Sequence, residues 1–191
     1  MSIFFHLNQE MFLRIAPELH LKLLLIGGFD RVFEIGKQFR NEGTSPNHNP
    51  EFTTCEFYAA YSDYKDVMAL TGRMLRRIVS GLFGEEMLVP YSMKGRPVLL
   101  DFKTKFNKLD FFSSLESALG KALPSPEEID RDSEETRSKL FQLCQENQIS
   151  VKESMNCGKL LDKLFSQLVE PELAQPTFVL DFPQCLSPLG N

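Results

Sequence analysis

Two stretches with strand periodicity, separated by a loop of turn residues, constrain the fold of this chain more than any other feature. In residues 31–42 the apolar side chains Phe33, Ile35 and Phe39 share one parity, and the other parity carries Glu34, Gly36, Gln38, Arg40 and Glu42. Residues 52–61 also divide by parity into two sets. Because successive side chains of a strand point to opposite faces, these runs predict strands with two chemically distinct faces.

The residues between the two runs favour an antiparallel hairpin with a long loop. Residues 43–50 read Gly-Thr-Ser-Pro-Asn-His-Asn-Pro, and nearly all of these residue types interrupt strands. In this hairpin Cys55 is expected on the core side. The other side gathers a charged triad and two aromatic residues, namely Arg40, Glu42, Phe52, Glu56 and Tyr58. Such a set offers partners for a phosphate, a planar base and a small cation.

An ordinary surface hairpin is the alternative to a binding site. An Arg and a Glu on the exposed face of a hairpin usually form a solvated pair that contributes little stability. Single exposed aromatic residues are also common. The periodicity of the two runs does not decide between these alternatives.

Several short strings surround the hairpin or lie within it. They read Leu-Arg-Ile-Ala-Pro-Glu-Leu at 13–19, Gly-Gly-Phe-Asp-Arg-Val-Phe-Glu-Ile-Gly at 27–36, His-Asn-Pro-Glu-Phe-Thr at 48–53 and Ala-Tyr-Ser-Asp-Tyr at 60–64. Because of these segments, residues 11–68 resemble lysyl-tRNA synthetases of subclass IIb in the region of motif 2, a motif of the class II aminoacyl-tRNA synthetases. The Arg-x-Glu pair at 40–42 is common to class II enzymes. The string at 48–53 is more specific, because aspartyl and asparaginyl enzymes depart from it.

The resemblance implies roles for the residues that match. Arg40 is similar to the motif 2 arginine that bridges the amino-acid carboxylate and the α-phosphate of ATP, and a planar guanidinium suits that task. Glu18 resembles the carboxylate that binds the α-amino group of lysine. Glu56 and Tyr58 resemble the pair that binds the ε-ammonium group, with Glu56 supplying the charge that selects lysine. Glu18 also fits the first turn of a helix that begins at Pro17, and both roles are compatible.

The same resemblance implies an ATP site on the hairpin and its loop. The residues that match the ATP-contacting positions are Arg40, Asn41, Glu42, His48, Asn49 and Phe52, with Phe52 stacking on adenine. The complete enzyme is expected to use Mg²⁺, with ligands outside this chain. No metal site is expected within the chain, because the histidines at 6, 20 and 48 lack the paired spacing of metal ligands.

The fold implied by the resemblance is α+β, a class II synthetase catalytic core in which helices flank an antiparallel sheet. Residues 1–191 are expected to form one partial catalytic domain, with the motif 2 hairpin at about 31–61. The anticodon-binding barrel, motif 1 and motif 3 have no counterpart in the sequence, so the chain resembles roughly the middle third of a synthetase. The stretch 121–132 is the only candidate linker, and it is too short to divide two domains.

The family activates lysine with ATP to lysyl-adenylate and transfers it to tRNA(Lys) in translation. The implied partners are therefore lysine, ATP and tRNA(Lys), and the complete enzyme is expected to be a homodimer. Three alternatives stay open: a paralogue that attaches lysine to translation elongation factor P, an inactive synthetase-derived interaction protein, and an incomplete gene model or splice product. Charging of tRNA by the chain alone is not expected, because motif 3 and the metal ligands are missing.

Composition favours a cytoplasmic globular protein. Of the 191 residues, 42% are hydrophobic and 25% are charged, which is ordinary globular usage. The longest apolar stretch, residues 23–26, is too short to cross a bilayer, and residues 1–10 lack the features of a signal peptide. The cysteines at 55, 144, 157 and 185 have no paired spacing, which predicts reduced thiols.

The net charge of −5 argues against an extensive basic surface for nucleic acid. No DNA partner is therefore expected, and most of the tRNA contact is expected elsewhere. The one cluster of positive residues is Arg73, Arg76 and Arg77. These three lie opposite the apolar stripe of a helix predicted at 63–82, so they are expected to form its solvated face.

The remaining pattern predicts a mixture of helices and strands. Strands are expected at 11–15, 98–106 and 177–182, and helices at 17–26, 63–82, 110–119, 132–147 and 159–169. Glycines at 27, 28, 84 and 120 are expected to end the first three helices.

Overall fold

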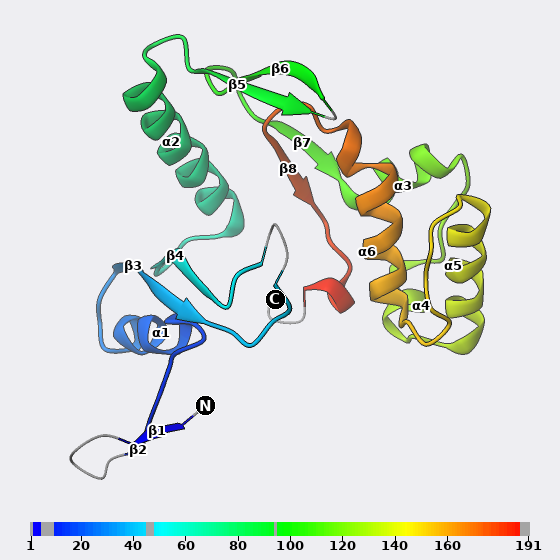
Figure 1. Cartoon of the computed structure of the whole chain (residues 1–191), viewed down its shortest axis with the longest axis horizontal. Helices are drawn as coiled ribbons and strands as arrows, with labels where there is room; N and C mark the ends of the chain where they lie inside the picture. The colour runs from blue at the N-terminus through cyan, green and yellow to red at the C-terminus, as the bar shows by residue number, and fades with distance from the viewer. Residues whose placement is uncertain (1, 5–9, 45–47, 94, 188–191) are drawn as a thin grey trace. The chain divides into compact units, whose positions relative to one another are not determined.

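The computed structural model describes residues 2–4, 10–44, 48–93 and 95–187 (Figure 1). The chain divides into two compact units, Met1–Val67 and Met68–Asn191, and the boundary falls inside helix α2 (Tyr64–Phe83). Each described sheet lies within one unit.

The first unit is built on a β-hairpin and a helix. Strands β3 (Arg31–Phe39) and β4 (Glu51–Ala59) pair antiparallel over their whole length, which confirms the predicted hairpin. Helix α1 (Glu18–Ile26) contacts both strands and buries Leu21. After α1 the chain turns at Gly28, whose φ of +100° is a conformation that other residues rarely adopt.

The segment before α1 lines one edge of the hairpin. A small antiparallel pair, β1 (Ser2–Phe4) and β2 (Glu10–Phe12), precedes it. The strand predicted at 11–15 therefore ends early. Beyond it, the Arg14 carbonyl accepts a hydrogen bond of 2.9 Å from the Phe39 N–H, so this part of the chain lies beside β3.

Helix α2 is amphipathic, as predicted, but much of its apolar stripe is exposed. The Asp63 side chain accepts a hydrogen bond of 2.9 Å from the Asp66 N–H and so caps the first turn. Val79 is buried. The exposed members of the stripe are Val67, Leu70, Ile78 and Leu82.

Besides the larger part of α2, the described part of the second unit contains two strand pairs and four α-helices. The strand pairs are the antiparallel β5 (Leu88–Met93) with β6 (Arg96–Asp101), and the parallel β7 (Asn107–Asp110) with β8 (Thr177–Leu180). The α-helices are α3 (Phe111–Leu119), α4 (Pro126–Asp130), α5 (Glu134–Glu146) and α6 (Cys157–Leu168). Two short 3₁₀ turns, Glu170–Glu172 and Gln184–Leu186, flank β8. The pairing of β7 with β8 is parallel because the helices carry the chain back between them.

The hydrophobic core of the second unit lies among these four helices. The rings of Phe111 and Phe165 stack at 4.5 Å between centroids. Leu115, Leu161 and Leu164 are fully buried around them. Side chains fix the helix starts, since each of Asp110, Ser125, Ser133 and Asn156 accepts a hydrogen bond from a backbone N–H in the first turn that follows.

The mixture of helices and strands agrees with the predicted α+β class. The described strands, however, form four separate two-stranded sheets, one of them parallel, where the prediction was a single antiparallel sheet. Strand β7 was not predicted, and the predicted linker at 121–132 contains helix α4. The helix is short, but Ser125 and Glu128 cap it reciprocally, which stabilises a turn that periodicity cannot detect.

Candidate functional site

The polar face of the hairpin is the covered one. Glu34, Glu56 and Tyr58 are half-buried, because α1 packs on this face and places Lys22 over the Tyr58 ring. On the opposite face Phe33 is 72% exposed.

The opposite face carries Ile35 and Cys55, which are exposed as well. The expectation that Cys55 lies on the core side is therefore wrong. Cys55 is exposed because no described element of this unit covers the apolar face, whereas helix α1 covers the polar face.

The structure brings together the three residues predicted to bind the two amino groups of lysine. The Tyr58 hydroxyl donates a hydrogen bond of 3.3 Å to Glu56 Oε2. The pKa of Tyr58 is raised to about 12, chiefly by burial and then by the charges of Glu18 and Glu56. Both carboxylates thus act on one phenol, which stays a neutral donor.

An ammonium group of the chain itself already lies at this place. Lys22 Nζ is 2.7 Å from Glu18 Oε1 and 5.9 Å from the centre of the Tyr58 ring. A carboxylate and an aromatic face are both favourable partners for an ammonium. The contacts of Lys22 therefore indicate that the groups of this site suit a primary amine.

Arg40 and Phe52 lie together at the loop end of the hairpin. The guanidinium carbon of Arg40 is 5.2 Å from the centre of the Phe52 ring. Arg40 Nε donates a hydrogen bond of 3.1 Å to the Ile15 carbonyl, and the Arg40 N–H donates one of 2.9 Å to the Pro50 carbonyl. The side chain is exposed, so its remaining donors face solvent and can reach an anion.

The other residues predicted to bind ATP lie on the loop. Asn41, Glu42, His48 and Asn49 are all exposed. The Glu42 N–H donates a hydrogen bond of 3.0 Å to the Arg40 carbonyl, which closes a tight turn around Asn41. Residues 45–47 lie outside the described part of the chain.

The two halves of the candidate site follow one another along the covered face. Phe52 and Glu56 are four residues apart on β4 and share a parity. At about 3.3 Å of rise per residue, they are separated by about 13 Å. The covered face therefore has carboxylates at one end and Arg40 with Phe52 at the other. The distance between the two ends suits an amino acid joined to a nucleotide.

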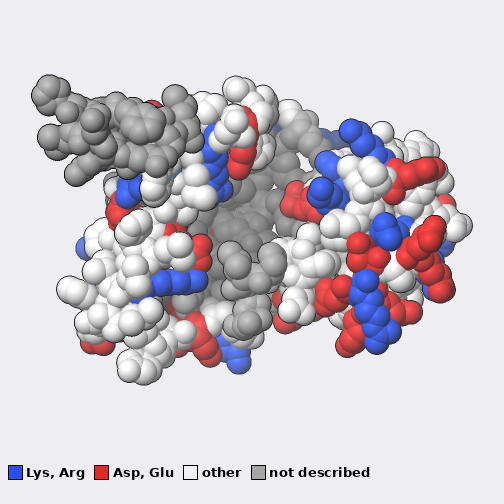
Figure 2. Space-filling model, turned by 90° about the horizontal axis from the view of Figure 1, so that it is seen from below, with Lys and Arg blue, Asp and Glu red and all other residues white. Residues whose placement is uncertain are grey.

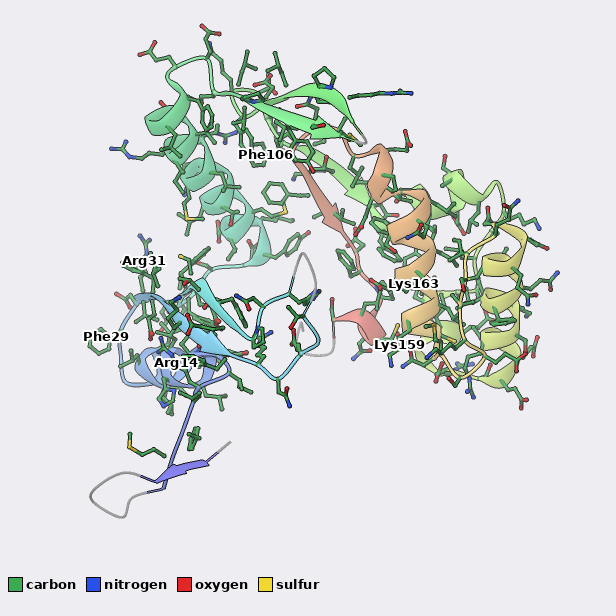
Figure 3. The ribbon with its side chains drawn as sticks, viewed as in Figure 1. Arg14, Phe29, Arg31, Phe106, Lys159 and Lys163 are labelled. Atoms are coloured by element: carbon green, nitrogen blue, oxygen red, sulfur yellow. The ribbon has the colours of Figure 1, made fainter. Side chains whose placement is uncertain are left out.

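Sequence reasoning assigned no role to Arg14. Arg14 Nη1 forms an ion pair with Glu34 Oε1, and Arg14 Nε donates a hydrogen bond of 3.0 Å to the Lys37 carbonyl. A Cβ atom on Gly36 would overlap Arg14 Nη2. Figure 3 shows Arg14 beside α1 and β3. The signal in the sequence was Gly36 itself, because a glycine inside a strand often marks a close approach.

Gln38 is a second residue that sequence reasoning missed. It is 0% exposed, and its Nε2 donates to Thr54 Oγ1 at 3.1 Å and to the Gly36 carbonyl at 3.4 Å. Its Oε1 has no hydrogen-bond partner among the described residues. A buried amide in the middle of the covered face separates the carboxylate end from the Arg40 end.

The second unit holds none of the predicted site residues. Two open grooves of about 330 and 700 Å³ lie along α5. The lysines of the smaller groove, Lys121 and Lys139, are paired at 2.7 Å with Glu146 and Glu135. Over α3 to α6, Figure 2 shows Lys and Arg interspersed with Asp and Glu. The face of this unit that Figure 2 shows therefore has no extended basic area for a nucleic acid.

The arginine cluster on α2 is not simply a solvated face. Arg73 and Arg77 are exposed, as predicted. Arg76 is half-buried, and its guanidinium carbon lies 5.4 Å from the centre of the Phe106 ring. Packing against an aromatic ring gives this arginine a structural role within the second unit.

Comparison with known proteins identifies the family. The family model described as tRNA synthetases class II (D, K and N) matches residues 3–191. The chain belongs to this family. The letters stand for aspartate, lysine and asparagine, so the predicted resemblance to a class II synthetase is confirmed.

The relatives found by comparison are named lysine-tRNA ligases. The chain is 44% identical over 190 residues to a probable cytoplasmic lysine-tRNA ligase of Encephalitozoon cuniculi. It is 45% identical over 188 residues to a lysine-tRNA ligase of Shewanella loihica and 41% identical over 188 residues to that of Aliivibrio salmonicida. Each match covers 97% of this chain and 36% of the relative. The chain thus spans about a third of the length of these class II synthetases.

The described residues contain no group of three or more His, Cys, Asp or Glu side chains arranged to hold a metal ion. Helices long and apolar enough to span a membrane are likewise not found in the described part of the chain.

Proposed function

We propose that this chain forms part of a lysine-tRNA ligase, which activates lysine with ATP to lysyl-adenylate and transfers lysine to tRNA(Lys). The proposal rests on one observation in particular. Glu18 and Glu56 both act on Tyr58 at the covered face of the hairpin, and on β4 Phe52 lies four residues from Glu56 and six from Tyr58. The names of the relatives support it.

The charge of this face favours lysine over the other two amino acids of the family. A lysine side chain ends in an ammonium group, which Glu56 and the Tyr58 oxygen can accept. An aspartate side chain would bring a second carboxylate beside Glu56 and be repelled. An asparagine amide would leave the charge of Glu56 without a counterion in a half-buried place, which is costly.

Arg40 is proposed to bridge the two reacting groups. The lysine carboxylate oxygen attacks the α-phosphorus of ATP, a new P–O bond forms and pyrophosphate leaves. Negative charge gathers on the α-phosphate oxygens during this step, and an exposed guanidinium with free N–H donors stabilises it. Phe52, Asn41, Glu42, His48 and Asn49 are proposed to hold the nucleotide, and Glu18 the α-amino group.

The proposal extends to the whole protein. Its catalytic domain is expected to build a larger antiparallel sheet around the β3–β4 hairpin, and to act as a homodimer in the cytoplasm. The family's use of ATP with Mg²⁺ is retained, with Mg²⁺ ligands outside the described residues.

Amino-acid-dependent exchange of pyrophosphate into ATP tests this function. The full-length protein should catalyse exchange with lysine and not with aspartate or asparagine, and should then attach lysine to tRNA(Lys). Exchange with aspartate or asparagine in place of lysine would overturn the proposed specificity. Lysyl-adenylate formation without transfer to tRNA would favour a ligase that uses another acceptor, such as translation elongation factor P. A protein that forms no adenylate with any of the three would be an inactive relative.

A further inference from the structure

Two carboxylates face each other at the lysine end of the hairpin. Glu34 and Glu56 are direct partners in the antiparallel register of β3 and β4, and both belong to the covered face. Directly opposite residues have Cβ atoms about 4.5–5.5 Å apart. Two uncompensated carboxylates at this separation would repel each other and compete for protons and cations.

Arg14 compensates one of the two. Its guanidinium forms an ion pair with Glu34. The hydrogen bond of 3.0 Å from Nε to the Lys37 carbonyl fixes the plane of the group. The absence of a Cβ at Gly36 leaves the space that the guanidinium occupies. Three independent features thus hold this cation beside Glu34.

Glu56 is left without a cation of its own. On the same face Glu18 pairs with Lys22 and Glu34 pairs with Arg14. Among the described residues none forms an ion pair with Glu56, and its hydrogen-bond partner is the neutral Tyr58 hydroxyl. The covered face therefore presents one uncompensated carboxylate, which matches one ammonium group.

We propose that Arg14 is a positioning residue of the lysine site, which neutralises Glu34 so that Glu56 alone receives the ammonium group of the substrate. This inference rests on the proposed function. Arg14 itself need not touch lysine. It leaves one unpaired negative charge at the lysine end of the covered face, and so fixes where along the strand the ammonium binds.

The pair predicts reciprocal effects in the full-length protein. In Arg14→Met, Glu34 is free to share a proton or the substrate ammonium with Glu56. In Glu34→Gln, the Arg14 guanidinium is free to turn to Glu56 and compete with the substrate. Each single variant should raise the KM for lysine at least tenfold at pH 7 in pyrophosphate exchange, and change the KM for ATP less than threefold. The double variant removes both free charges and should recover most of the loss.

The pH profile gives a second readout. The other charged or titratable groups near the pair are Tyr58, which donates to Glu56, and Glu18 and Lys22 from α1, which act on Tyr58. In Arg14→Met the KM for lysine should rise further between pH 8 and pH 6, because the two carboxylates then hold a shared proton. The double variant should lose this dependence.

A matched control lies on the other face of the same hairpin. Lys37 pairs with Glu51 at 2.7 Å, and both are exposed. Lys37→Met and Glu51→Gln should leave the KM for lysine within threefold of the wild-type value.

If the double variant of Arg14 and Glu34 is no better than Arg14→Met while all variants keep the wild-type melting temperature, Arg14 acts only by holding the chain beside β3, and the proposal is wrong. If the wild-type protein itself shows no lysine-dependent exchange, the proposed function fails instead.

If Arg14→Met does not fold, Glu34→Gln carries the test. A KM for lysine unchanged in that variant would also overturn the proposal, because the freed guanidinium would then have no effect on Glu56.

Discussion

Glu34 and Glu56 are directly opposite on one face of the β3–β4 hairpin, and Arg14 pairs with Glu34 only. Further along the same face, no described residue forms an ion pair with Arg40, which lies against Phe52. Among the described residues, the face therefore presents a carboxylate without an ion-pair partner at one end and a guanidinium without one at the other. This arrangement complements an amino acid whose side chain ends in an ammonium and whose carboxylate is to be activated.

Replacement of Arg40 should slow activation more than it weakens binding. In the full-length protein, Arg40→Ala should reduce lysine-dependent pyrophosphate exchange by roughly a hundredfold or more, the scale found on removing one preorganised donor. Arg40→Lys should recover little, because a point charge cannot bridge two anions as a planar guanidinium does. A near-normal rate in Arg40→Lys would show that Arg40 supplies charge but does not bridge.

Tyr58 should remain protonated throughout the physiological range. The folded chain raises its pKa from 10 to about 12, so the folded state holds the phenolic proton more tightly than the unfolded state. This contribution to stability is complete below about pH 10 and is lost as the pH rises toward 12. Tyr58→Phe should therefore flatten the fall in thermal stability between pH 10 and pH 11. An equal fall in both proteins would contradict the raised pKa.

The sequence allowed the hairpin and most helices to be predicted, because their periods and caps are local. The covered face of the hairpin could not be predicted in this way. Parity separates Ile35 and Cys55 from Glu34 and Glu56, but only the packing of α1 decides which set is buried. The candidate site residues came from the resemblance to a family. The role of Arg14 came from the structure, since it depends on a strand register and on space left by Gly36.

Thiol reactivity tests the exposed face directly. In the 191-residue chain, iodoacetamide at pH 8 should alkylate Cys55 first. Cys55 and Cys185 are both exposed, but partial burial and the charge of Asp130 raise the pKa of Cys185. Burial raises the pKa of Cys144 to about 11 and that of Cys157 to about 12, with Asp132 adding to the latter. Each unit of pKa lowers the reactive thiolate fraction about tenfold. Peptide mapping by mass spectrometry measures the order, and protection of Cys55 would show that its face is covered.

The core of the second unit should be sensitive to truncation. Leu161 is 0% exposed within the helical core, so Leu161→Ala should lower the free energy of unfolding by about 2–5 kcal/mol. Leu99 in β6 is 56% exposed, and Leu99→Ala serves as the matched control with a much smaller loss. Urea unfolding followed by far-ultraviolet circular dichroism measures both, since the chain has no tryptophan. Equal losses would contradict the assignment of the core.

The most direct test of the account is the affinity of the full-length protein for lysine when Glu56 loses its charge. Glu56→Gln keeps the size of the side chain and removes the one uncompensated carboxylate of the covered face. A hydrogen bond to a charged group contributes about 1.5–3 kcal/mol, so the KM for lysine should rise roughly tenfold to a hundredfold and the KM for ATP should stay nearly unchanged. Glu51→Gln, on the opposite face of the same strand, should change neither. Equal losses for lysine and ATP in Glu56→Gln, or no loss for lysine, would contradict the assignment of this carboxylate to the lysine ammonium.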